Sequence, residues 1–207
     1  MNSPKILVGT PLNDAKNYII MDWLASLSKI TYDNIDIMLV DNSITTDNYK
    51  MLLKMGYNVK YYDPANKTIK QVIAGSRNIL REYAIKNNFD YIFSLECDVF
   101  PPNNAIEKLL LHNRPVVSGF YLNGSLDSNF TVIQKQIGHI GHKFHTVHNY
   151  SVHDGFMMSN GKVVPVYTAG LGCVLISKSV FSELQFKARE DQDGTDDVFF
   201  AEDLYHL

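Results

Sequence analysis

The chain has 207 residues, of which 45% are hydrophobic and 20% are charged, and its formal net charge is −3. This composition is typical of one globular domain with a sizeable core and excludes a disordered segment. The acidic surplus argues against a nucleic-acid partner, because nucleic-acid-binding proteins usually carry a basic excess.

The cysteines and the apolar runs bear on the compartment. Cys97 and Cys173 are far apart, lack zinc-site spacing, and lie in apolar runs that predict buried free thiols. The sequence shows no basic-then-apolar leader and no run near the ~18 apolar residues of a membrane span. We therefore expect a soluble cytoplasmic protein without a transmembrane segment.

The first residues predict a β-α unit. Residues 5–9 form an apolar run typical of a buried strand, and Thr10 and Pro11 begin the loop at its carboxyl end. This loop lacks G-x-G-x-x-G, which counts against a dinucleotide-binding dehydrogenase. Apolar residues at helical spacing then predict a helix over about 16–30.

The next segments repeat this alternation. A second strand over 35–40 ends in Asp41, a helix is expected over 47–55, and a third strand over 58–62. Alternating strands and helices predict a parallel sheet with right-handed crossovers. Asp41 either contacts a ligand at the edge of the sheet or caps the next helix.

A capping box, Thr68-x-x-Gln71, opens a long predicted helix that ends near Lys86. Arg77 lies at the margin of the apolar stripe of this helix. It either reaches a ligand or covers the helix edge with its aliphatic stem.

Two acidic residues follow the strand predicted over 91–95. If the chain stays extended, Glu96 and Asp98 point the same way, at the edge where open α/β sheets bind ligands. A hard divalent cation fits such a pair, since Mg²⁺ takes one or two carboxylates together with substrate phosphates. The alternative is a solvated acidic turn.

Residues 122–165 differ in composition from the rest. Gly, Asn and His become frequent there, and residues 159–162 predict a tight hairpin, so we expect antiparallel strands and loops. Five of the seven His lie between His139 and His153. They could form a zinc site, a wall beside a sugar, or a solvated loop, and the lack of HExxH and of a Cys partner counts against zinc.

Five short segments, in order, resemble the nucleotide-sugar-dependent glycosyltransferases with the GT-A fold, of the family 2-like, DxD type. Glu96-Cys97-Asp98 resembles the DxD element, with Glu for the commoner first Asp. The other segments resemble the family's Ala-Arg-Asn, Val-Val-Ser-Gly-x-Tyr, Ala-Gly-x-Gly-x-x-Leu-Ile and Glu-Asp motifs, and they are 76–78, 116–121, 169–176 and 196–197.

This resemblance implies an α/β fold, a single-domain α/β/α sandwich with a mostly parallel central sheet and a small antiparallel addition. Residues 1–207 would form one domain, with a nucleotide-binding part over about 1–114 and an acceptor-side part over about 115–207. The chain stops soon after the last motif, so we expect a minimal version or the N-terminal domain of a longer protein.

The activity implied is transfer of a hexose from a nucleoside-diphosphate sugar to a hydroxyl of a glycan or glycoprotein, with inversion and with Mn²⁺ or Mg²⁺. Glu96 and Asp98 would hold the metal, and Asp197 would act as general base. Glu202 and Asp203 form a competing acidic pair. The donor would be bound by Thr10, Pro11, Asp41, Arg77, Glu96, Asp98, Gly170 and Gly172.

Two alternatives remain open. A sugar-nucleotide pyrophosphorylase on a related fold usually has a basic, Gly-rich loop after the first strand, and residues 9–12 contain no Lys or Arg. A non-catalytic module that binds sugar or nucleotide would not hydrolyse a nucleotide sugar, even slowly.

Overall fold

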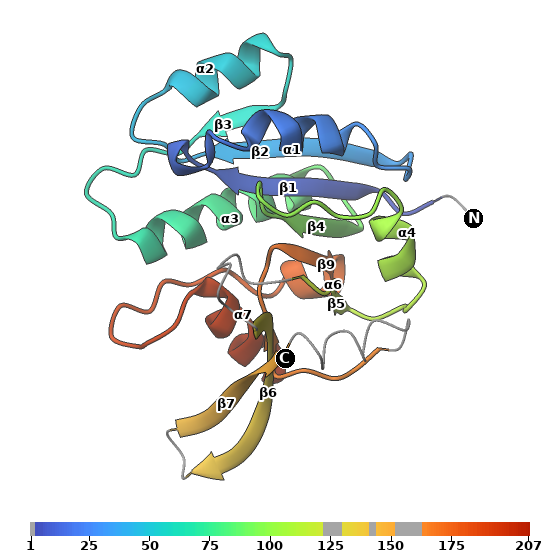
Figure 1. The fold of residues 1–207 in the computed structure, drawn as a ribbon, viewed down its shortest axis with the longest axis vertical. Coiled ribbons are helices and arrows are strands. Elements are labelled where there is room, and N and C mark those ends of the chain that lie inside the picture. Colours follow the sequence, from blue (N-terminus) through green and yellow to red (C-terminus); the bar gives the residue numbers. More distant parts are fainter. Residues whose placement is uncertain (1–2, 122–129, 141–143, 152–162) are drawn as a thin grey trace.

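Figure 1 shows the computed structural model, which describes residues 3–121, 130–140, 144–151 and 163–207, the two middle ranges by their backbone alone. One six-stranded sheet organises the chain, in the order β3-β2-β1-β4-β9-β5. Its strands are β1 (Ile6–Leu12), β2 (Ile35–Asp41), β3 (Val59–Tyr61), β4 (Tyr91–Leu95), β5 (Val116–Ser118) and β9 (Cys173–Ser177).

The parallel part of the sheet is centred on β1. This strand pairs in parallel with β2 on one side and with β4 on the other, so Gly9 lies between Met38 and Ser94. β9 is inserted antiparallel between β4 and β5. The expected mostly parallel sheet is confirmed, and the carboxyl ends of β1, β2 and β4 share one edge.

Helices cover both faces of this sheet. They are α1 (Ile20–Leu27), α2 (Asp47–Lys54), α3 (Ile69–Lys86), α4 (Ala105–Leu110), α6 (Lys178–Phe181) and α7 (Asp196–Tyr205), and a 3₁₀ turn, η1 (Asp14–Lys16), precedes α1. Alternate residues of β1 serve the two cores: Ile6 and Val8 pack towards α1, α2 and α4, and Leu7 packs towards α3, α6 and α7. The predicted α/β/α sandwich is confirmed.

α3 begins with the predicted capping box. The Thr68 side chain accepts a hydrogen bond from the Gln71 N–H at 3.2 Å, and the Gln71 side chain accepts one from the Thr68 N–H at 3.0 Å. A Cβ on Gly9 would lie 3.3 Å from the Leu80 side chain. Glycine at this position therefore lets α3 cross β1 closely and brings its residues to the edge of the sheet.

A small second sheet has the order β7-β6-β8 and contains β6 (Phe130–Ile140), β7 (Phe144–Ser151) and β8 (Thr168–Ala169). β6 pairs antiparallel with both neighbours, which confirms the antiparallel addition (Figure 1). The predicted hairpin at 159–162 and the His side chains between 139 and 153 lie outside the described residues. Among the described helices, none combines the length and apolar character needed to cross a bilayer.

Candidate active site at the carboxyl edge of the sheet

The two predicted metal ligands follow β4 in a turn. The Val99 N–H donates to the Glu96 carbonyl at 3.0 Å, and Cys97 between the two acids is buried. The expectation that Glu96 and Asp98 share one face of an extended chain is therefore wrong, because β4 ends at Leu95. The two carboxylates instead contact two different cations.

Glu96 is paired with Arg77, which comes from α3. The Arg77 Nη2 lies 2.8 Å from Glu96 Oε1, and its Nη1 donates to Ser94 Oγ at 2.8 Å. The carbonyl of Leu171 accepts from the Ser94 hydroxyl at 2.6 Å and lies 3.5 Å from Arg77 Nη1. One guanidinium thus joins α3, β4 and the turn before β9.

Arg77 also contacts the N-terminus of α7. Its Nε lies 2.7 Å from Asp196 Oδ2, in a buried ion pair. The side chains of Arg77 and Asp196 are only 4% and 6% exposed. The expectation that Arg77 lies at the margin of the buried face is therefore wrong, since carboxylates from two other elements enclose its charge.

Two opposing effects set the pKa values of Arg77 and Asp196: burial disfavours each charge, and the opposite charge of the partner favours it. Burial disfavours the Arg77 charge, but Asp196 and Glu96 outweigh it and raise the pKa of the guanidinium. Burial raises the pKa of Asp196, and the nearby Arg77 charge opposes that rise. Because an arginine side chain stays protonated in proteins and the two groups are in direct contact, the pair is charged.

Gly172 brings the backbone close to Glu96. The Gly172 N–H donates to the Tyr121 hydroxyl at 2.8 Å, and the Gly172 carbonyl accepts from the Glu96 N–H at 3.0 Å. A Cβ on Gly172 would lie 2.6 Å from the Tyr121 hydroxyl oxygen and 2.9 Å from Glu96 Oε2. Any other residue would therefore force the ends of these two side chains to shift. Burial, with the charge of Glu96, raises the pKa of Tyr121.

Sequence reasoning did not select Tyr121, although it ends the segment that resembles Val-Val-Ser-Gly-x-Tyr. Its hydroxyl contacts Gly172 across 51 residues of sequence, so no local pattern could pair the two. Gly170, the other predicted glycine, is buried just after β8.

Lys16, which sequence reasoning also missed, contacts the second predicted metal ligand. Its Nζ lies 2.5 Å from Asp98 Oδ2, and the two side chains are 37% and 34% exposed. The hydrogen bond that Lys16 donates to Asp98 raises the pKa of Lys16, against the effect of burial. Lys16 ends the 3₁₀ turn η1, so the loop after β1 places a cation next to the turn that follows β4.

The predicted nucleotide contacts lie at the ends of β1 and β2. Thr10 pairs with Leu39 in parallel register, so Thr10 and Asp41 face the same side of the sheet. Both residues are fully buried, and Thr10 Oγ1 and Asp41 Oδ2 have no hydrogen-bond partner. Pro11 follows Thr10 and is partly exposed.

The Asp41 side chain forms an Asx turn. Its Oδ1 accepts from the Ser43 N–H at 3.1 Å and from the Ser43 hydroxyl at 2.5 Å. Burial raises the pKa of Asp41, and hydrogen bonds from Ser43 and from the Tyr49 N–H oppose this rise. The Asp41 side chain therefore stabilises the turn that leads into α2, and its contact with a ligand stays a prediction.

The acidic residues of α7 occupy two environments. Asp197 accepts hydrogen bonds from the Thr195 hydroxyl and from the Val198 N–H, and its charge contributes to the raised pKa of Arg77. Asp203 and Glu202, the competing pair, are held by Arg189, whose nitrogens lie 2.6 Å from each carboxylate. The competing pair therefore has its own counter-ion further along the helix.

The two carboxylates could hold a divalent cation only if a bound ligand supplied further oxygens. Glu96 contacts Arg77 through Oε1 and Asp98 contacts Lys16 through Oδ2, and no hydrogen bond among the described residues reaches the other oxygen of either carboxylate. Within the ranges that the structure describes, no group of three or more His, Cys, Asp or Glu side chains could hold a metal. Two carboxylates plus phosphate oxygens would complete the coordination that Mg²⁺ prefers.

The formal charge around this edge also suits a divalent cation. Among the described residues, four carboxylates and two cations lie here and sum to a formal charge of −2. The carboxylates belong to Glu96, Asp98, Asp196 and Asp197, and the cations are Arg77 and Lys16.

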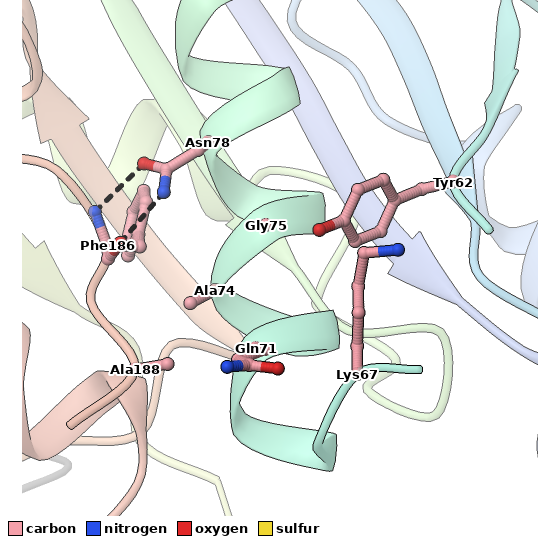
Figure 2. Close-up of a pocket in the computed structure, with 8 residues that line it drawn as sticks. All are labelled: Tyr62, Lys67, Gln71, Ala74, Gly75, Asn78, Phe186 and Ala188. Atoms are coloured by element: carbon pink, nitrogen blue, oxygen red, sulfur yellow. Dashed lines mark hydrogen bonds between the residues drawn. The ribbon is translucent and has the colours of Figure 1, made fainter. Parts of the chain in front are cut away.

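A separate pocket of about 340 Å³ lies on the face of α3 that points away from the sheet (Figure 2). Gln71, Ala74, Gly75 and Asn78 line it from the helix, Tyr62 and Lys67 from one side, and Phe186 and Ala188 from the other. Asn78 exchanges two hydrogen bonds with the Phe186 backbone, at 2.8 and 3.0 Å. The pocket contains none of the predicted site residues, so it is distinct from the candidate active site.

Known structures share this fold. Over 97% of the chain, S. aureus TarS superposes with a TM-score of 0.57 at 14% sequence identity. TarS residues 1–349 in complex with UDP-GlcNAc match 95% of the chain, with a TM-score of 0.56 and 14% identity. The mannosyltransferase PcManGT from Pyrobaculum calidifontis, in complex with GDP-Man and Mn²⁺, matches 98%, with a TM-score of 0.57 and 13% identity.

These likenesses establish a GT-A type of fold. The chain spans 33% of the TarS chain and 52% of the PcManGT chain. No protein-family profile matches the sequence, and a search of curated proteins finds no match.

Proposed function

We propose that this chain is the catalytic domain of a metal-dependent glycosyltransferase, which moves a hexose from a nucleoside-diphosphate sugar to a hydroxyl of a glycan or glycoprotein. The observation that carries the proposal is the arrangement at the carboxyl edge of the sheet. There, Glu96 and Asp98 lie beside the ends of strands that present two buried, unpartnered polar atoms. Neighbours that bind UDP-GlcNAc, or GDP-Man with Mn²⁺, support the same chemistry on this fold.

The nucleoside would bind over the ends of β1 and β2. A buried oxygen without a partner costs free energy until a ligand supplies a donor, and Asp41 Oδ2 and Thr10 Oγ1 are two such oxygens. A ribose hydroxyl or a base N–H would satisfy Asp41. Pro11 would pack against the nucleoside, and Gly170 and Gly172 would let the backbone approach the donor sugar.

Glu96 and Asp98 would hold Mn²⁺ or Mg²⁺ through the oxygens that the two cations leave free. The ion, when bound, neutralises charge on the diphosphate leaving group. Arg77 would act through Glu96, by holding Oε1 and leaving Oε2 to the metal. In this proposal Arg77 is a positioning residue, and not the direct donor contact that the resemblance implies.

Asp197 would be the general base that takes the proton of the acceptor hydroxyl. A base of this kind must be accessible to that hydroxyl, and Asp197 is partly exposed whereas Asp196 is buried against Arg77. Attack by the deprotonated hydroxyl on the face opposite the leaving group inverts the anomeric centre.

The experiment is a thermal-unfolding screen with UDP, GDP, UDP-GlcNAc and GDP-mannose, each with and without Mn²⁺. Ligand at about 100 times its Kd adds about 2.7 kcal/mol of stability, which in a chain of this size raises Tm by roughly 5–11 °C. We expect that rise with Mn²⁺ and its loss in Asp98→Asn. Asp22→Asn, an exposed carboxylate on α1, is the matched control.

A protein whose Tm responds to no nucleotide would contradict the proposal. Binding without slow hydrolysis of any nucleotide sugar would instead identify a binding module. Pyrophosphate-dependent release of a nucleoside triphosphate would identify a pyrophosphorylase.

A further inference from the structure

Among the residues that the structure describes, Lys16 is the solvent-accessible cation that contacts a predicted metal ligand. Its ammonium contacts Asp98 Oδ2 at 2.5 Å, and both side chains are about one-third exposed. The other cation, Arg77, is enclosed by Glu96, Asp196 and Ser94. The two cations of this edge therefore differ in their freedom to move.

The backbone that carries Lys16 is well anchored. The Asn13 side chain accepts from the Ala15 N–H at 3.0 Å, and the Lys16 carbonyl accepts from the Ile19 N–H at 3.0 Å. Asn17, the next residue, accepts from the Asn48 side chain of α2 at 2.8 Å. Lys16 is thus a flexible side chain on a fixed turn, at the carboxyl end of β1.

The ion pair with Asp98 adds little to stability. Ion pairs at this level of exposure contribute little net free energy, because solvent screens them and ordering two side chains costs entropy. A lysine ammonium is also a compact charge on a four-carbon stem, with three donors that can be redirected. The fold therefore tolerates loss of this contact.

We propose that Lys16 is an exchangeable counter-ion: it neutralises Asp98 until a divalent cation and a nucleoside diphosphate bind, and then moves to the diphosphate oxygens. Binding of the cation to Asp98 displaces the ammonium, and the incoming phosphates supply new acceptors within reach of the same stem. No bond is made or broken. This inference rests on the proposed function, because the ligand is the diphosphate of that donor.

The exchange predicts opposite effects on two affinities. Without nucleotide, Lys16 competes with Mn²⁺ for Asp98, so Lys16→Met should bind Mn²⁺ about fivefold more tightly. With Mn²⁺ present, the same variant lacks a diphosphate contact and should bind UDP or GDP about fivefold more weakly. Lys16→Arg keeps the charge and should stay near wild type in the second measurement.

The test measures free Mn²⁺ by electron paramagnetic resonance, and UDP and GDP affinity by calorimetry in the presence of Mn²⁺. Lys29→Met, an exposed lysine at the end of α1, is the matched control, and thermal unfolding verifies that each variant is folded. Opposite shifts in Lys16→Met support the proposal. Shifts of the same sign, or none, in a protein whose wild type binds UDP or GDP overturn it while the proposed function stands. A wild type that binds neither nucleotide overturns both.

Discussion

Replacing Arg77 with Met should strongly destabilise the protein, because it leaves the buried carboxylate of Asp196 without a counter-ion. Arg77 and Asp196 are 4% and 6% exposed, and the Arg77 Nε lies 2.7 Å from Asp196 Oδ2. Removing one partner of such a pair typically costs about 3–5 kcal/mol. Glu96 adds little to this loss, because its side chain is 39% exposed and water can solvate it.

That loss should be visible in thermal and urea unfolding. In a chain of this size, about 3–5 kcal/mol corresponds to a fall in Tm of roughly 6–20 °C. Arg114→Met, which removes an exposed arginine, should change the free energy of unfolding by about 0.5 kcal/mol or less.

The stability deficit of Arg77→Met should also depend on pH. Without Arg77, burial leaves the folded pKa of Asp196 above its unfolded value, so the folded variant binds the proton more tightly. Stability from this group is present below the unfolded pKa and is lost as the pH rises through the folded pKa. The deficit should therefore shrink as the pH falls from 7 towards 5.

The double variant Arg77→Met/Asp196→Asn tests the cause directly. It removes both charges, so it should recover much of the stability that Arg77→Met loses, and the coupling between the two sites should exceed about 1 kcal/mol. A single-variant loss below about 1 kcal/mol, or a double variant no more stable than Arg77→Met, would refute the reasoning.

Three further predictions concern catalysis, donor binding and the thiols. Asp197→Asn should lower kcat about 10²–10⁴-fold in a transfer assay while donor Kd is unchanged, whereas Asp196→Asn should lower Tm and lower kcat by a much smaller factor. Gly172→Ala should weaken UDP binding in calorimetry by about tenfold, because the new methyl group would overlap the Tyr121 hydroxyl and displace Glu96. Burial raises the pKa of Cys97 to about 12 and that of Cys173 to about 11, so neither native thiol should react with a disulfide reagent at pH 8. Because these folded pKa values exceed the unfolded ones, the free energy of unfolding should fall as the pH rises above about 9.

The features that could be predicted from the sequence are those encoded locally. The apolar run before Glu96 predicts β4, and Thr68 with Gln71 predicts the start of α3, because a strand period and a capping box need only neighbouring residues. The strand–helix alternation then places the ends of β1, β2 and β4 at one edge. The sheet edge was therefore predictable before any long-range contact was known.

The contacts between these ends were not predictable. The partner of Asp98 is 82 residues away, on a turn whose direction depends on Asn13 and Asn48. The burial of Arg77 depends on α7, which reaches α3 only after the chain has passed through the second sheet. Helical spacing placed Arg77 at the edge of the apolar stripe, but it could not show that a carboxylate would cover that edge.

The two adjacent acids of α7 show how the fold can divide one motif between two tasks. Successive helical residues point about 100° apart, so when Asp196 turns inward to Arg77, Asp197 is directed to a different side of the helix N-terminus. Asp197 is held there by the Thr195 hydroxyl and the Val198 N–H, in a region where the helix dipole favours a carboxylate. If Asp197 is the base, the role of Asp196 is to fix the position of that base through Arg77. The same guanidinium holds Glu96, so the metal ligand and the base would share one positioning residue, and a change at Arg77 should perturb both.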